Sequence, residues 1–459
     1  MTYRLTFPFL AALLLSACAA APELDGAPTA AMRAAEFQPA SGAPQVIAQP
    51  GSAWRLDFGD AGLARMLAEA DAGGLDVASA RARFKAADLT YAQQRRDSSG
   101  MTPGASVSAG REGLTINASL GIEPDLAGRF DAALRGGALE HAASGIDLWL
   151  ARRTLAREVT LGWIALAEAR TRAARLGAEI AAEDRAIALL EARLAAGEIT
   201  SSELAARRQT RSQARAQEAS AATQIGLAEA RLRSLGARTI PAAISLKSAQ
   251  RPALGAQTDL AHAASIPEVC AAFLRFHAAD AARAQTLADA RPRLVATSSL
   301  SVTARSLAAL ASGNVLALGN MVSLEGTLVD GGAARAQLDQ ARVSVAQAEI
   351  EWLRAVGQAE IAALESVAAR QNAEVALDGA LESWRAADAE LGRVQLRRDA
   401  GLADGLDLAE AERARLGAQR EIDSARADAF RAAATGYETL PARVPACAPA
   451  PRTQPSRSL

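Results

Sequence analysis

The stretch from Val322 to Arg398 decides the fold: it begins V-S-L-E-G-T-L-V-D-G-G and continues A-A-R-A-Q-L-D-Q-A-R-V-S-V. Apolar and polar residues alternate from Val322 to Leu328, which is typical of a half-buried strand. From Ala333 to Arg398 the apolar residues recur at three- and four-residue steps without a proline, as in a helix. At about 1.5 Å per residue this helix is roughly 100 Å long, more than the core of a globular domain needs.

This predicted helix carries two rows of apolar residues. The first row follows a heptad pattern through Leu338, Ala341, Val345, Ala348, Trp352, Ala355, Ala359 and Ala362. The second row follows Val343, Ile350, Gly357 and Leu364. The second row begins five residues after the first, and rows with this offset lie about 140° apart around a helix. The arrangement favours a helix with a neighbour on each flank, as in a closed ring of helices; a helical stalk with one wide apolar face is the alternative.

The whole pattern occurs twice, with an offset of about 204 residues. The offset pairs Ile146 with Ile350, Arg193 with Arg397, Ala196 with Ala400, Gly197 with Gly401 and Leu204 with Leu408. Internal repeats decide the architecture, and each copy here predicts a helix, two strands, a long helix, a turn and a return helix. We expect a first repeat at 54–240 with strands at about 103–122, a linker at 241–266, a second repeat at 267–440 with strands at about 293–303 and 318–329, and a disordered tail at 441–459.

The predicted strands have the pattern of a hairpin that crosses a membrane. Ala105, Val107 and Ala109 alternate with serines, and Leu114 and Ile116 begin a second alternating run of about ten residues. A soluble hairpin on a helical body is the alternative. Because lipid cannot satisfy an open sheet edge, four membrane strands must be completed by other copies of the chain.

The first residues are typical of an export signal. Residues 1–17 contain an apolar run, Leu5–Leu15, that is too short to span a bilayer as a helix. The signal ends in Leu15-Ser16-Ala17-Cys18, which resembles the bacterial lipobox, so we expect lipidation, with palmitate among the acyl chains, at Cys18. A plain secretory signal with an incidental cysteine is the alternative. Residues 18–53 are rich in Ala, Pro and Gly and predict an extended tether.

The composition argues against two classes of protein. A formal net charge of −1 gives no electrostatic support for nucleic-acid binding. The histidines His141, His262 and His277 lack metal-ligand spacing, and His141 falls on a face of the first long helix, where we expect it to pack. We find no catalytic constellation and expect neither an enzyme nor a cofactor.

The order of elements resembles the TolC family of outer-membrane efflux proteins over about residues 54–440. The motifs that carry the resemblance are Phe58-Gly59-Asp60, Glu123-Pro124-Asp125-Leu126-Ala127-Gly128-Arg129, Asp330-Gly331-Gly332, Arg398-Asp399-Ala400-Gly401-Leu402 and Tyr437-Glu438-Thr439-Leu440. With the lipobox, the chain is most similar to the outer-membrane lipoproteins of resistance-nodulation-division (RND) pumps. Trp163 stands where the family commonly has a tyrosine.

The resemblance implies a mainly α protein with a small transmembrane β part. Three copies would form a 12-stranded β-barrel in the outer membrane and an α-helical barrel in the periplasm. The resemblance further implies passive efflux of small molecules, a periplasmic adaptor and an inner-membrane RND pump as partners, and a gate at the periplasmic tip.

The resemblance also assigns residues to the tip. It implies that two turns contact the adaptor, and these are Ala196-Gly197-Glu198 and Ala400-Gly401-Leu402. At that contact glycine would allow close backbone approach. The nearby acids Asp399, Asp404 and Asp407 are candidates to narrow the closed pore and favour cations. Cys270 and Cys447 fall in the family's equatorial region, and because the periplasm is oxidising, they are candidates for a disulfide.

Two other functions stay open at this stage. A type I secretion duct, which exports proteins, would share the same architecture. A periplasmic coiled-coil adaptor lipoprotein would also explain the long helices, but it should carry a β-rich module between them, where this sequence has only turns. Neighbouring genes would separate the two duct functions: a pump and an adaptor for efflux, an ABC transporter for secretion.

Overall fold

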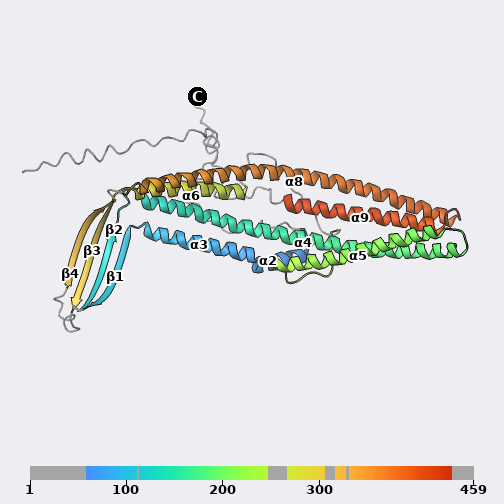
Figure 1. Cartoon of the computed structure of the whole chain (residues 1–459), viewed down its shortest axis with the longest axis horizontal. Coiled ribbons are helices and arrows are strands. Elements are labelled where there is room, and N and C mark those ends of the chain that lie inside the picture. Colours follow the sequence, from blue (N-terminus) through green and yellow to red (C-terminus); the bar gives the residue numbers. More distant parts are fainter. Residues whose placement is uncertain (1–57, 111–112, 247–265, 305–315, 327–329, 437–459) are drawn as a thin grey trace, which may run out of the picture. The chain divides into compact units, whose positions relative to one another are not determined.

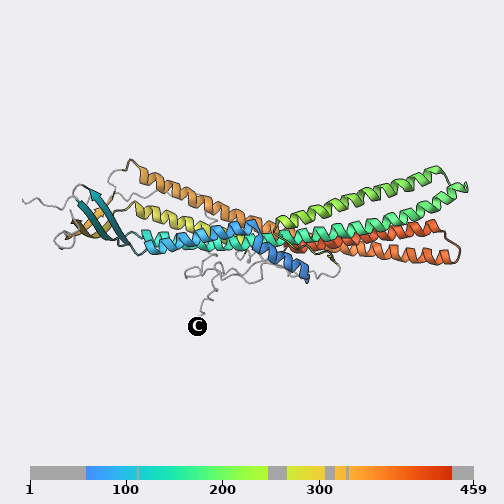
Figure 2. The same cartoon turned by 90° about the horizontal axis from the view of Figure 1, so that it is seen from below.

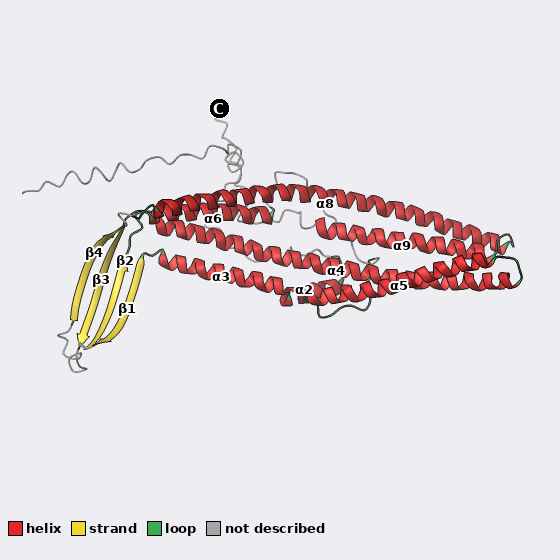
Figure 3. Ribbon diagram, viewed as in Figure 1, coloured by secondary structure: helices red, strands yellow, loops and turns green. Residues whose placement is uncertain are grey.

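The computed structural model describes residues 58–110, 113–246, 266–304, 316–326 and 330–436. In this part of the chain long helices and one four-stranded sheet account for the regular structure (Figure 3). None of its helices is both long enough and apolar enough to cross a bilayer. The expected signal, tether and tail, and most of the linker between the repeats, lie outside the described residues.

The order of elements is the same in the two repeats (Figure 1). After α2 (Ala61–Gly73), the first repeat contains α3 (Leu75–Asp97), β1 (Met101–Gly110), β2 (Gly113–Ile122), α4 (Arg129–Ala195) and α5 (Ser201–Ser234). The second contains α6 (Pro267–Asp289), β3 (Arg293–Ala304), β4 (Leu316–Glu325), α8 (Ala333–Asp399) and α9 (Gly405–Gly436).

The two long helices match in length and in the way they begin. Both α4 and α8 have 67 residues. Each is preceded by a left-handed glycine, Gly128 at φ 77° and Gly332 at φ 92°, a conformation that costs other residues free energy. Asp330 fixes the start of α8, because its carboxylate accepts hydrogen bonds from the backbone of Gly332 and Ala334.

The sheet is antiparallel, in the order β1-β2-β3-β4, so β1 and β4 are its two edges. Val107 lies opposite Ile116 on one face, and Ser106 lies opposite Asn117 on the other. The same alternation continues across β2 and β3, where Thr115 faces Thr303 with 3.2 Å between their hydroxyl oxygens. The sheet therefore has an apolar face and a face of small polar side chains.

The helices pack as two hairpins joined along one interface. Helix α4 packs against α5, and α8 packs against α9, as Figure 2 shows for the green and the orange-red pairs. Helix α4 also contacts α9, α6 and α3, and α8 contacts α6. We call the contact between α4 and α9 the inter-repeat interface, because it joins the first repeat to the second.

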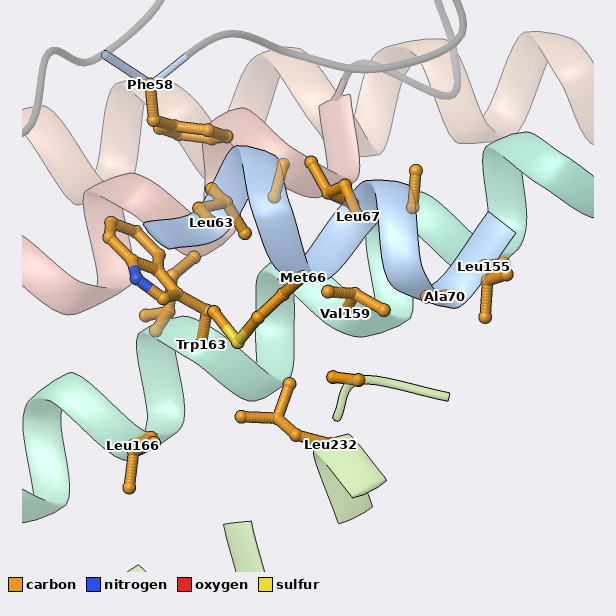
Figure 4. Close-up of a cluster of buried hydrophobic side chains, with 14 of the residues drawn as sticks. Phe58, Leu63, Met66, Leu67, Ala70, Leu155, Val159, Trp163, Leu166 and Leu232 are labelled. Atoms are coloured by element: carbon orange, nitrogen blue, oxygen red, sulfur yellow. The ribbon is translucent and has the colours of Figure 1, made fainter. Parts of the chain in front are cut away.

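The principal apolar core lies where α2 crosses α4, close to α5 and α9 (Figure 4). Trp163, Met66 and Leu63 are buried there. Phe58 stacks on Phe430 of α9 with 5.6 Å between the ring centroids. Burial of large side chains at about 25 cal/mol per Å² makes this cluster a strong anchor between α4 and α9.

Candidate functional site: the two helical tips

The two turns that end the long helices have the same backbone geometry. At the first turn Gly197 has φ 74°, and Glu198 donates a backbone hydrogen bond to Arg193. At the second turn Gly401 has φ 73°, and Leu402 donates to Arg397. Each is a Schellman ending, which favours glycine at the left-handed position. No atom of the described residues lies within 4 Å of the place that a Cβ would take at either glycine. In this part of the chain the two glycines therefore serve the backbone angle and not a close approach.

The two tips differ in side-chain chemistry. The six turn residues that the resemblance singled out, Ala196, Gly197, Glu198, Ala400, Gly401 and Leu402, are all exposed. The first tip presents the carboxylate of Glu198, whereas the equivalent residue of the second tip is Leu402, an apolar side chain that is 71% exposed. A partner that contacts both tips would therefore meet one acidic and one apolar surface.

One ion pair ties the two tips together. Arg193, near the end of α4, donates to the carboxylate of Asp404 across 2.6 Å. The other carboxylate oxygen of Asp404 accepts from the backbone of Leu406 and Asp407 at the start of α9. In return, Asp407 accepts from the Asp404 backbone, as in a capping box. The Asp407 backbone donor and the Arg193 guanidinium hold the pKa of the Asp404 carboxyl below its usual range.

The three candidate pore acids therefore have different surroundings. Asp404 and Asp407 are both engaged in beginning α9, and Asp404 is also paired with Arg193. Asp399 is the last residue of α8 and is exposed. The pattern of the sequence gave no sign that an arginine 211 residues away would pair with Asp404.

Further from the tips, the inter-repeat interface is lined with ion pairs. Because α4 and α9 run antiparallel, the partners follow one another in opposite order along the two helices. The pairs are Arg431 with Glu168, Arg175 with Asp423, Arg420 with Glu179, Arg413 with Glu183, and Arg185 with Glu412. The sequence shows arginines and acids along both helices but does not indicate which of them pair.

One of the two apolar rows on α8 is covered by the chain itself, and the other is not. Trp352 of the first row is 1% exposed. In the second row Val343, Ile350 and Leu364 are each more than half exposed. The second row is thus available to a neighbour outside the chain.

The remaining candidates pack in the helical body. The ring of His141 stacks between Phe84 and Tyr91, as expected of a packing residue. His277 lies against Phe273, and burial lowers its pKa. In the part of the chain that the structure describes, no three His, Cys, Asp or Glu side chains come together to hold a metal ion.

Cys270 is fully buried on α6 and takes part in a disulfide. Cys447, Cys18 and His262 lie outside the described residues. The pairing of Cys270 with Cys447 thus stays a prediction, as does lipidation at Cys18.

Solved structures show what this arrangement resembles. No protein-family model matches the chain, and no curated protein matches it by sequence. A membrane protein from Pseudomonas aeruginosa is 21% identical with a TM-score of 0.72, covering 84% of this chain and 95% of that chain. The outer membrane protein VceC from Vibrio cholerae is 20% identical with a TM-score of 0.70, covering 83% and 96%. The open state of the Neisseria gonorrhoeae MtrE outer membrane channel is 21% identical with a TM-score of 0.65, covering 82% and 88%.

The chain has the TolC-like fold. The matches cover 82–84% of a chain whose described residues contain both repeats and the four-stranded sheet. The expectation of the fold from the sequence is confirmed.

Proposed function

We propose that this chain forms the outer-membrane duct of a tripartite efflux pump, in which small molecules pass from the periplasm to the exterior without chemical change. The observation that carries the proposal is the sheet, which has one apolar face, one polar face and two edges that are not paired with each other. Its fold is shared with proteins described as outer membrane channels.

The open flanks of the chain support assembly from several copies. A sheet in lipid must close, and β4 of one copy can pair with β1 of the next. The exposed apolar row on α8, with Val343 and Ile350, lies on the same repeat as β4 and offers a second strip of contact. Such a head-to-tail contact generates a ring, and the resemblance sets its size at three copies, or 12 strands.

The tips are the proposed gate and the proposed contact with a periplasmic adaptor, which would couple the duct to an inner-membrane RND pump. The paired tips, joined through Arg193 and Asp404, represent a closed arrangement in this proposal. Adaptor contact at Ala196–Glu198 and Ala400–Leu402 is supported by the exposure of both turns. Asp399, exposed at the end of α8, is the acid best placed to meet a passing cation.

Two covalent features complete the proposal. Lipidation at Cys18 would hold the chain at the outer membrane, and a bond between Cys270 and Cys447 would fasten the C-terminal segment to α6. Alkylation mass spectrometry of native protein tests the disulfide: protection of both thiols until reduction is expected, and a freely alkylated Cys447 would contradict it.

The decisive experiment is mild-detergent extraction of outer membranes, followed by native mass spectrometry and single-channel recording. The proposal expects a trimer with a small, stable conductance. A monomer or dimer confined to the periplasm would refute the duct and favour the coiled-coil adaptor. Cells lacking the chain should accumulate small toxic compounds; loss of protein secretion without such accumulation would favour the type I secretion duct.

A further inference from the structure

The inter-repeat interface contains a cluster of charged side chains around two buried glutamates, about three to four helical turns from the tip. Glu179 and Glu183 lie on the same face of α4, and only 8% and 3% of their surfaces are exposed. Arg420 of α9 reaches Glu179 at 2.7 Å. Arg413 of α9 and Arg207 of α5 approach the same oxygen of Glu183 at 3.9 and 3.7 Å. We call these five residues the buried charge cluster, and they join three helices.

The carboxylate of the tip pair is much closer to solvent than those of the cluster. The side chain of Asp404 is 43% exposed, against 4% for Glu183 and 10% for Glu179, whereas the arginines are partly exposed at both places, with 34% for Arg193, 48% for Arg413 and 35% for Arg420. Water can take over the partners of the tip pair when it separates. The second carboxylate oxygen of Glu183 is buried and has no hydrogen-bond partner among the described residues, so within this part of the chain the carboxylate depends on its two arginines.

The cost of parting the charged groups therefore rises along the interface from the tip inward. Parting the tips also separates Leu406 of α9 from the apolar cluster of Ile187, Leu190 and Leu204. An exposed ion pair contributes little and is screened by salt. Parting a buried pair leaves an uncompensated charge in a medium of low dielectric constant, which costs far more. Further inward still, Trp163 and Phe430 pack with 6.5 Å between their ring centroids, and that apolar contact closes the interface at its other end.

We infer that the buried charge cluster marks the point along the interface at which opening stops, and we call this point the fulcrum. Helix α9 can separate from α4 only on the tip side of the cluster. Below it, toward Asp404, the α8–α9 hairpin separates from the α4–α5 hairpin when the tips part. Above it, toward Phe430, the two hairpins stay packed. This inference rests on the proposed function, since it states where the proposed gate bends.

Contacts of Arg207 with two other helices explain why the buried charge cluster keeps α9 packed against α4. Arg207 belongs to α5 and also pairs with Glu410 of α9, so the return helices of both repeats meet through it. Glu183 is thus fixed from the partner helix of its own hairpin as well as from α9. The tip pair has no such third helix in the described contacts of Arg193 and Asp404.

Pairs of spin labels placed above and below the cluster test the inference in the full-length assembly. One pair replaces Arg172 and Ser424, on the side toward Phe430, and the other replaces Ala195 and Leu402 at the tip. Labelled chain is diluted with unlabelled chain so that each assembly carries one labelled copy. The distribution of distances between the two spin labels is then measured by double electron–electron resonance in the parent, in Arg193→Ala and in Glu183→Gln.

Arg193→Ala should shift the tip pair to longer distances and leave the upper pair unchanged. Glu183→Gln should lengthen both, because the parting region then extends toward Phe430. Glu183→Met, which keeps the volume of the side chain, should behave like Glu183→Gln. Each of the two variants can replace the other if one of them does not assemble. Glu191→Gln is the matched control: Glu191 pairs with Arg208 inside the α4–α5 hairpin, and this change should move neither pair.

An upper pair that lengthens in Arg193→Ala, or that stays fixed in both Glu183 variants, overturns the fulcrum. The distances do not depend on conduction. A protein that shows the expected distances but no conductance would refute the duct and leave the fulcrum standing.

Discussion

Helix α9 has two long neighbours, and it meets them with different chemistry. Its contact with α8 consists mainly of small and apolar side chains, among them Ala380 with Ile422 and Ala425, and contains one ion pair, between Arg415 and Asp388, among the described residues. Its contact with α4 is a succession of ion pairs with apolar packing at both ends, at Leu406 near the tip and at Phe430 in the core. The side of α9 toward α8 is thus mainly apolar, and the side toward α4 is mainly charged.

The difference shows which helices move together. Close apolar packing loses its dispersion contacts as soon as a gap opens, so α8 and α9 act as one body. Partly exposed ion pairs can exchange a protein partner for water at little cost. On the tip side of the buried charge cluster the inter-repeat interface can therefore open largely by exchanging ion pairs for water. The apolar contact that separates with them is that of Leu406 with the cluster of Ile187, Leu190 and Leu204.

The largest effect is expected from the apolar contact. Ile422→Ala removes a side chain that is 3% exposed, and the cavity should lower the free energy of unfolding by about 2–5 kcal/mol. Thermal or denaturant unfolding in detergent measures it. Leu402→Ala, at an exposed turn, is the control and should change stability by less than about 0.5 kcal/mol. Equal losses in the two variants would mean that the α8–α9 contact is not what holds this hairpin.

A smaller effect is expected at the tip pair. Asp404→Ala removes both a helix cap and an ion pair, whereas Asp404→Asn keeps a side chain that can cap. The alanine variant should be less stable than the asparagine variant by about 1 kcal/mol. Arg193→Ala, which removes the ion pair alone, should cost at most about 1 kcal/mol.

The pH dependence separates the two contributions at the tip. Because the pKa of Asp404 is lowered in the folded chain, its stabilising effect is present at neutral pH and is lost as the pH falls below the usual aspartate range. Unfolding curves of parent and Asp404→Asn should therefore converge in acid. If the stabilities of the parent and Asp404→Asn differ by the same amount down to the lowest accessible pH, the ionised carboxylate of Asp404 does not stabilise the tip.

The smallest change in the free energy of unfolding is expected at Glu179, and it should be a gain in stability and not a loss. Burial raises its pKa against the opposing effect of Arg420 and Arg413, with Glu183 adding repulsion. A raised pKa means that protonation favours the folded state, so the charged form weakens folding as the pH rises through the folded pKa. Glu179→Gln should thus be as stable as the parent or more stable, by up to about 1 kcal/mol, at neutral pH. The difference should vanish in acid; a marked loss at neutral pH would contradict this prediction and show that the charge of Glu179 holds the interface in addition to that of Glu183.

The sequence predicts the order of elements and the tips because these depend on local pattern. Helical and alternating periods predict α8 and the strands; β4 runs from Leu316 to Glu325, whereas the sequence predicts a strand at about 318–329, of which 327–329 lie outside the described residues. The glycines at 197 and 401 mark the turns, although their role in the chain is a positive φ and not a close approach.

The pairing between helices could not be obtained in the same way. Arginine and acid alternate on every exposed helix face, so the sequence does not say which arginine meets Asp404 or Glu183. The reversed order of charges on α4 and α9 is a signal of antiparallel pairing, but it becomes useful only once the two helices are known to be neighbours. The second apolar row on α8 illustrates the opposite case: the sequence called for a neighbour on that flank, and the single chain leaves the row exposed.

The equal length of α4 and α8 has a consequence for evolution. A residue inserted in one of them would turn its tip by about 100° and carry Arg193 out of line with Asp404. We therefore expect insertions and deletions to be tolerated when α4 and α8 change in length together, by a number of residues that returns Arg193 to the side of α4 that faces Asp404. Relatives of this chain should then differ in the length of both long helices and not of one alone.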